Sequence, residues 1–201
     1  MPNVCLLPDK DCSINRPSPN AAYNATLLYM DALYLSGVKT QQYRTLMHWT
    51  IPAEVNAAEV YKAILCLGNM AVPFGSAAAH IYRVIQEGWT EAAATWNKYD
   101  GVNVWGTAGC DLDGTDYDST EFTAVTMPAN HTRWFEVDIT AMVTDAITNH
   151  SRSLNLIFRL DDENPGTSIQ FYWKSKDNAI DTWTRPYLNI VRPPFGMPVE
   201  V

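Results

Sequence analysis

The sequence has no long apolar run and no cluster of basic residues. None of its apolar stretches reaches the roughly 18 to 20 residues that a membrane-spanning helix requires, and residues 1–13 lack the basic and apolar segments of a signal peptide. Lysine and arginine number 14 against 22 acidic residues, so the formal net charge is −8. Nucleic-acid-binding proteins usually carry a basic patch instead. We therefore expect neither nucleic acid nor a membrane as a partner.

Charged residues and cysteines are also scarce. Charged residues make up 18% of the chain and apolar residues 47%, which is enough apolar material for a core and too little charge for a disordered chain. The cysteines, Cys5, Cys12, Cys66 and Cys110, form no CxxC pair and no cluster with histidine at zinc spacing. A disulfide between Cys5 and Cys12 is one alternative, and reduced, partly buried thiols are the other.

Motifs of catalytic chemistry are missing. The histidines are His48, His80, His131 and His150. None of them falls in a GxSxG or HExxH context, so no catalytic triad can be named. Glu91 and Asp111 would suit glycoside hydrolysis only if their carboxyl groups lay about 5 to 10 Å apart. Glu91 is more simply explained as an acceptor for backbone N–H groups in a turn. The sequence therefore predicts a protein that is not an enzyme.

Short extended segments, separated by turn-forming residues, recur along the whole chain. They are residues 26–35, 43–49, 59–67, 80–84, 120–126, 134–139, 153–160, 169–174 and 187–191. Alternate residues from Tyr61 to Leu67 are apolar, so we expect them to face the core and Cys66 to point away from it. This pattern predicts an all-β fold, specifically a two-sheet antiparallel β-sandwich of the jelly-roll type.

One short helix should connect two of these strands. It is expected to begin with Thr140 as N-cap and to carry an apolar stripe from Met142 to Ile147. Residues 1–20 and 193–201 are rich in proline and lack periodicity. We therefore expect an extended N-terminal arm over 1–20, one sandwich domain over 21–192 and a C-terminal tail over 193–201.

Several blocks of the sequence together resemble a known family. The most specific is EGWTEAAATWN at 87–97, followed by Trp105, Gly109 and the acidic CDLDGTDYDS at 110–119. These blocks resemble the signature of the DNRLRE-type domain, a jelly-roll family related to disaggregatase repeats. Further similar blocks are RTLMHWTIP at 44–52, VYKAILCL at 60–67, WFEVDITAMV at 134–143 and RPYLNIV at 185–191. The resemblance implies a two-sheet sandwich, often attached to secreted or wall-anchored bacterial proteins, with polysaccharide binding attributed to some members.

The tryptophans suggest two alternative roles. In the first, residues of the signature pin a loop onto the sandwich; these are Trp89, Glu91, Thr95, Trp96 and Asn97. In the second, aromatic faces stack on sugar rings. The candidates for ligand binding are Trp105, Trp173, Trp183 and Arg185.

An acidic loop suggests one metal site. Its carboxylates are Asp111, Asp113, Asp116 and Asp118, which could supply oxygen ligands to Ca²⁺. The spacing is not that of an EF-hand, because Gly114 falls two positions early. The alternative is a solvated loop whose aspartates make Asx turns. We predict no cofactor other than this calcium.

Two classes of function are consistent with these features. The first is a structural or display protein of an assembly, specifically a bacteriophage virion surface component that is made in the host cytoplasm. Its partners would be other virion proteins and copies of itself, and the two arms could lie on these neighbours. The second is a carbohydrate-binding module of a secreted or cell-wall bacterial protein, for which an acidic polysaccharide is one ligand class to consider. The family resemblance implies this second class.

Overall fold

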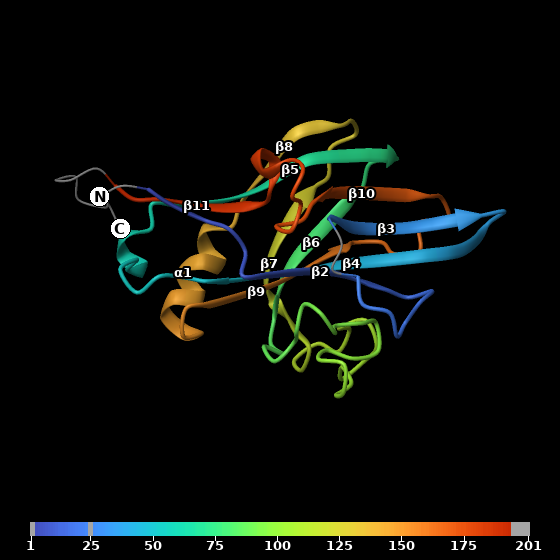
Figure 1. The fold of residues 1–201 in the computed structure, drawn as a ribbon, viewed down its shortest axis with the longest axis horizontal. Coiled ribbons are helices and arrows are strands. Elements are labelled where there is room, and N and C mark those ends of the chain that lie inside the picture. Colours follow the sequence, from blue (N-terminus) through green and yellow to red (C-terminus); the bar gives the residue numbers. More distant parts are fainter. Residues whose placement is uncertain (1–2, 24–25, 194–201) are drawn as a thin grey trace.

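The computed structural model of the chain describes residues 3–23 and 26–193. Within them the chain forms strands, one α-helix (α1, Thr140–Asn149) and two short 3-10 helices, η1 (Ala57–Glu59) and η2 (Thr182–Thr184) (Figure 1). The strands are β1 (Val4–Leu6), β2 (Lys10–Asn15), β3 (Leu27–Leu35), β4 (Val38–Thr50), β5 (Lys62–Phe74), β6 (Ala78–Val84), β7 (Tyr117–Thr126), β8 (Thr132–Asp138), β9 (Ser153–Leu160), β10 (Ile169–Lys174) and β11 (Tyr187–Val191). No helix in this part of the chain is long and apolar enough to cross a membrane.

The strands form two antiparallel sheets that share β5. Sheet A contains β1, β11, the first part of β5, and β8. Sheet B continues from the end of β5 through β10, β3, β4, β9, β6 and β7, with β2 beside β4. The main core lies between the sheets: Leu65, for example, pairs with Leu188 on one side and Val137 on the other, and all three are buried. The predicted all-β sandwich with one helix is confirmed.

All nine predicted extended segments overlap strands of the structure. On β5, Ala63, Leu65 and Leu67 face the core as expected, and Cys66 lies on the opposite face. The expectation for Tyr61 is wrong, since its side chain is 68% exposed. The residue precedes the strand, where the alternation of faces no longer applies.

The N-terminal segment is a correction to the sequence prediction. Residues 1–20 were expected to run as an arm outside the sandwich, yet β1 pairs with β11 and β2 pairs with β4 along its whole length. Cys12 and Ile14 on β2 are completely buried. Both strands are short and lie between prolines, which hides them from a search for periodicity. The predicted tail, apart from Pro193, lies outside the described residues.

The helix spans the predicted residues, but its N-terminal contact differs from the prediction. The carboxylate of Asp138, not the side chain of Thr140, accepts the first N–H of the helix, that of Thr140, at 3.0 Å. The Thr140 hydroxyl instead accepts the backbone N–H of Ala63 at 2.9 Å, so it links the helix to β5. The buried side chains of the helix are Met142, Val143 and Ala146.

A second apolar cluster lies on the outer face of sheet B. The segment 85–116, green in Figure 1, folds across that face. It contributes Trp89, Trp96, Trp105 and Cys110, which pack against side chains of β2, β4 and β9. The segment therefore covers the outer face of sheet B over β2, β4 and β9.

Candidate functional site

The tryptophans of the signature segment are buried. Trp89 is 1% exposed and donates its indole N–H to the side chain of Asn155 at 3.0 Å. Trp96 is 8% exposed and lies beneath the guanidinium of Arg44. Trp105 is 3% exposed and donates to the carbonyl of Thr95 at 2.9 Å. The burial of Trp89 and Trp96 agrees with the predicted pinning role.

The polar residues of the signature hold the same segment in place. Glu91 accepts a backbone N–H of β2 at 3.1 Å, the acceptor role expected of it. The hydroxyl of Thr95 accepts the N–H of Lys98 at 3.0 Å, and Asn97 donates to the side chain of Asn20 at 3.0 Å. These contacts stabilise the turn and link it to β2 and to the segment after β2.

Arg44 on β4 fastens the segment to sheet B. Its side chain is 1% exposed and donates to the carbonyl of Gly109 at 2.6 Å and to both carboxylate oxygens of Glu163. A nitrogen of Arg44 also lies 3.2 Å from Asp111. Burial alone would raise the pKa of the two carboxyl groups, but the charge and hydrogen bonds of Arg44 bring both pKa values below their usual range.

Asp116 has a structural role in the acidic loop. It is completely buried and accepts backbone N–H groups from Gly106, Thr107 and Leu112 at 2.7, 2.9 and 3.0 Å. Three N–H donors satisfy a buried carboxylate in place of water. The side chain therefore holds the end of the loop together.

The other three aspartates of the loop face separate partners, which corrects the predicted calcium site. Asp111 pairs with two arginines, on β4 and β9. Asp113 accepts two hydrogen bonds from Ser119, and Asp118 accepts two from Thr120. The structure directs the four carboxylates to four sets of protein donors rather than to one cation. The alternative predicted from the sequence was a loop with Asx turns. Asp118 forms such a turn, because its side chain accepts the backbone N–H of Thr120, two residues further on.

The four cysteines are free thiols. Cys12, Cys66 and Cys110 are buried and Cys5 is exposed. Burial raises the pKa of Cys110 well above its usual value, which keeps this thiol protonated. The reduced-thiol alternative therefore describes the structure, and the clip between Cys5 and Cys12 is not formed.

Of the three tryptophans considered as sugar platforms, one is exposed. Trp105 and Trp173 are 3% and 0% exposed, and Trp173 packs against Phe158 in the main core. Neither ring offers a free face to a ligand. Trp183 is 82% exposed. The sequence could not separate the three, because their burial depends on segments that are distant in the sequence.

The outer face of sheet A carries a set of aromatic and polar side chains that the sequence did not group. Trp134 on β8 and Tyr187 on β11 lie on either side of β5, with ring centroids 5.2 Å apart and an interplanar angle of 74°. Both rings are half-buried. Glu136 and Asn189 point from the same face. Together with Trp183 we call these residues the aromatic face.

The turn that carries Trp183 lies directly against this face. A Cβ atom on Gly68 of β5 would come within 2.0 Å of the carbonyl oxygen of Thr184, so only glycine allows the turn to pass there. The turn is held by Arg185, whose Nε donates to the carbonyl of Asn178 at 3.1 Å. Arg185, a predicted ligand-binding residue, therefore positions the turn and remains half-exposed.

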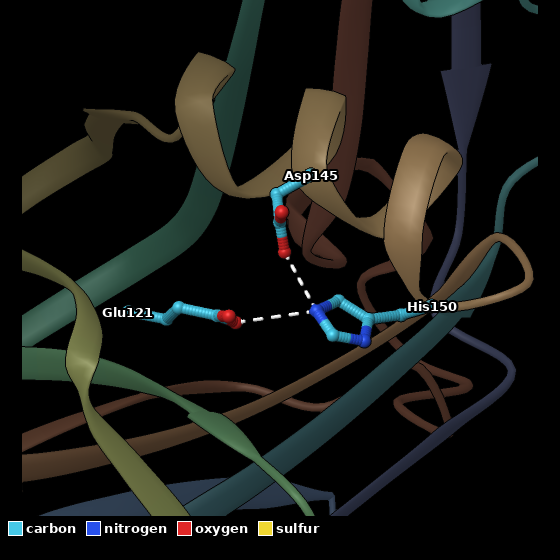
Figure 2. Close-up of side chains that lie close together, drawn as sticks. All are labelled: Glu121, Asp145 and His150. Atoms are coloured by element: carbon cyan, nitrogen blue, oxygen red, sulfur yellow. Dashed lines mark ion pairs between the residues drawn. The ribbon is translucent and has the colours of Figure 1, made fainter.

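A second group of chemically active side chains lies at the opposite sheet, between β7 and α1. Figure 2 shows His150 between two carboxylates, with its Nε2 atom 2.7 Å from Asp145 and 3.4 Å from Glu121. Arg83 pairs with Glu121 from the other side. A cavity of about 270 Å³, whose floor includes Met142, adjoins the group.

These four residues form an ion-pair network. Arg83 pairs with Glu121 and also lies 3.4 Å from Asp118, and His150 lies within ion-pair distance of both Glu121 and Asp145. A histidine beside carboxylates could also exchange protons or bind a cation. However, Arg83 pairs with Glu121, so a cation bound there would have to compete with this ion pair. We assign the network to the attachment of α1 to β6 and β7.

No protein-family model matches the chain, and no curated protein matches it either. The resemblance to the DNRLRE-type domain therefore stays a prediction. The choice between functions rests on the geometry of the two outer faces. The segment 85–116 covers the outer face of sheet B over β2, β4 and β9, and the outer face of sheet A presents the aromatic face.

Proposed function

We propose that the protein is a non-enzymatic glycan-binding module and that the aromatic face is its binding surface. The observation that carries this proposal is the position of Trp183, which is 82% exposed on a turn that is fixed against the outer face of sheet A. The resemblance to the DNRLRE-type domain implies the same class of function and a secreted or cell-wall setting.

The exposure of Trp183 favours a binding role for physical reasons. A large aromatic ring in water adds no burial energy to the fold. Single exposed apolar residues are common, but grouped ones mark interaction sites, and Trp134 and Tyr187 lie half-buried on the same face as Trp183. The C–H face of a pyranose ring is apolar and matches an indole in size. Because Arg185 and Gly68 fix the turn, little conformational entropy would be lost on binding.

The polar members of the aromatic face suit hydroxyl groups. Glu136 supplies acceptors, and Asn189 supplies both a donor and an acceptor. Asp138 lies on the same face beyond Glu136. The net charge of −8 disfavours an acidic polysaccharide, although on the face itself Asp138 is paired with Lys62. We therefore favour a neutral, hydroxyl-rich glycan over an acidic one.

The structure weakens the argument for the alternative, a virion surface subunit. That argument used the N-terminal residues as an arm that contacts neighbouring subunits. Residues Val4–Leu6 and Lys10–Asn15 are instead strands of the sandwich. They are therefore not free to lie on another chain, and the glycan-binding module becomes the better-supported proposal.

The proposal is tested by binding to a panel of neutral and acidic polysaccharides in affinity electrophoresis, followed by calorimetry on the best oligosaccharide. We expect Trp183→Ala to weaken binding about tenfold or more, as the loss of a central aromatic contact does. The control is Val102→Ala, which removes another exposed apolar side chain from the segment 85–116. Absence of binding to the whole panel, or equal effects of the two substitutions, would overturn the proposal.

A further inference from the structure

Asp11 on β2 is an unusual buried carboxylate. The residue is 1% exposed. Its Oδ2 atom accepts the backbone N–H of Lys176 at 2.7 Å, but Oδ1 is buried and has no hydrogen-bond partner among the described residues. A buried carboxylate oxygen without a donor is strongly unfavourable in a folded protein. A cation at this oxygen would compensate the charge of an ionised Asp11.

Two more carboxylates converge on Asp11. Glu91 comes from the segment 85–116 and Asp177 from the turn after β10, and one oxygen of each of the three residues lies within 4.8 Å of the others. The side chain of Glu91 is 20% exposed and that of Asp177 is 49% exposed. The group is thus closed on the Asp11 side and open to solvent on the Asp177 side.

The positive charge nearby does not balance the group. The ammonium of Lys176 lies 3.0 Å from Glu91 and 3.0 Å from Asp177, so a bound cation has to displace it from these two carboxylates. The ammonium makes no contact with the free oxygen of Asp11. Lys10, the other neighbouring cation, donates to the carbonyl of Trp89 instead. One ammonium against three carboxylates leaves a local charge of about −2 when all are ionised.

We propose that Asp11, Glu91 and Asp177 bind a Ca²⁺ ion. All the donors are oxygen atoms, which suits a hard cation and does not suit zinc. Calcium accepts six to eight oxygen ligands in flexible geometry, and the open side of the group leaves room for water ligands. Magnesium requires a near-ideal octahedron, which three carboxylates from separate segments are less suited to provide.

A cation here would link three segments that are far apart in the sequence. Asp177 directly precedes Asn178, whose side chain accepts the N–H of Asp181 at the start of the turn that carries Trp183. Calcium should therefore stabilise this turn. An effect of calcium on glycan binding would rest on the proposed function. The calcium site itself does not rest on it.

The test is calorimetric titration of the chelator-treated protein with CaCl₂, MgCl₂ and ZnCl₂ in the absence of any glycan, with thermal unfolding in parallel. We expect one Ca²⁺ per chain, a higher Tm with Ca²⁺ than with Mg²⁺, and at least about tenfold weaker binding in Asp177→Asn. Asp11→Asn should lose binding and yet remain folded without calcium, because the amide removes the buried charge.

The matched control is Asp113→Asn, which removes an exposed carboxylate from the acidic loop and should leave the titration unchanged. The proposal is overturned if about 5 mM Ca²⁺ gives neither heat nor a shift in Tm, or if Asp113→Asn weakens binding as much as Asp177→Asn. It is also overturned if the protein prefers Zn²⁺ and loses it in His150→Ala, which would assign the cation to the network of Figure 2. Because no glycan is present, none of these outcomes bears on the proposed function.

Discussion

Replacement of Arg44 by methionine should release the segment 85–116 from sheet B. Methionine fills much of the same volume without a charge or a donor. It would leave Glu163, whose side chain is 11% exposed, and the carbonyl of Gly109 without their main partner. Breaking a buried ion pair from one side typically costs about 3 to 5 kcal/mol. The lower end is appropriate here, because Arg159 remains 3.4 Å from Glu163 and 2.6 Å from Asp111.

We therefore expect Arg44→Met to lower the free energy of unfolding by about 3 kcal/mol in urea at pH 7. The control is Lys62→Met, which removes a half-exposed pair with a 3.8 Å separation and should cost less than about 1 kcal/mol. The double variant Arg44→Met with Glu163→Leu should recover part of the loss, because it no longer leaves a buried charge unpaired.

The pH dependence gives an independent check on this ion pair. The folded pKa of Glu163 lies below its usual value, so the stabilisation is present above the unfolded pKa and is lost as the pH falls through the folded pKa. The difference between wild type and Arg44→Met should accordingly shrink in acid. A loss in Arg44→Met no larger than that in Lys62→Met, or a difference that does not change with pH, would refute the reasoning.

Three further predictions concern the second apolar cluster and the buried carboxyl group of Asp31. Gly109→Ala should lower the free energy of unfolding by considerably more than about 1 kcal/mol, because a Cβ atom there would lie 2.6 Å from the Trp96 ring. The control Gly114→Ala should cost only about 1 kcal/mol, because its Cβ meets no atom and only the positive φ is unfavourable. Equal losses of the two variants in urea unfolding would contradict this prediction. Trp96→Ala should cost about 3 to 5 kcal/mol, and a variant as stable as wild type would show that the ring does not hold the segment. Burial raises the pKa of Asp31 to about 6, so its contribution is present below its usual pKa and is lost as the pH rises through about 6. The free energy of unfolding should therefore contain a component of about 1 to 3 kcal/mol that falls between pH 4 and 7, and Asp31→Ala should abolish it.

The strands were predictable from the sequence because one face of each is apolar. Leu65 and Leu67 alternate with residues of the opposite face, and such a period survives without any knowledge of the partner strands. The strand Lys10–Asn15 was missed for a different reason. The residues from Asp11 to Asn15 do alternate between polar and apolar, but the run is only five residues long, it lies between prolines, and both of its faces are buried.

The candidate sites were less predictable because they combine distant segments. Trp134 and Tyr187 meet only because β8 and β11 pair with opposite edges of β5. Asp11, Glu91 and Asp177 come from three segments that no local spacing relates. In the acidic loop the sequence misled in the opposite way. Its aspartates are close in sequence and suggested one calcium site, but in the fold each accepts hydrogen bonds from a different set of donors.

The central claim, that the aromatic face binds a glycan, is tested most directly by the indole N–H signals of the seven tryptophans in an ¹⁵N-labelled sample. The neutral oligosaccharide that binds best is titrated into the protein, and each signal is assigned by substitution. The account predicts that the signals of Trp183 and Trp134 shift with saturation, while those of the buried Trp89 and Trp105 stay in place. Shifts confined to Trp89 and Trp105, or no shift of Trp183 at saturating ligand, would contradict it.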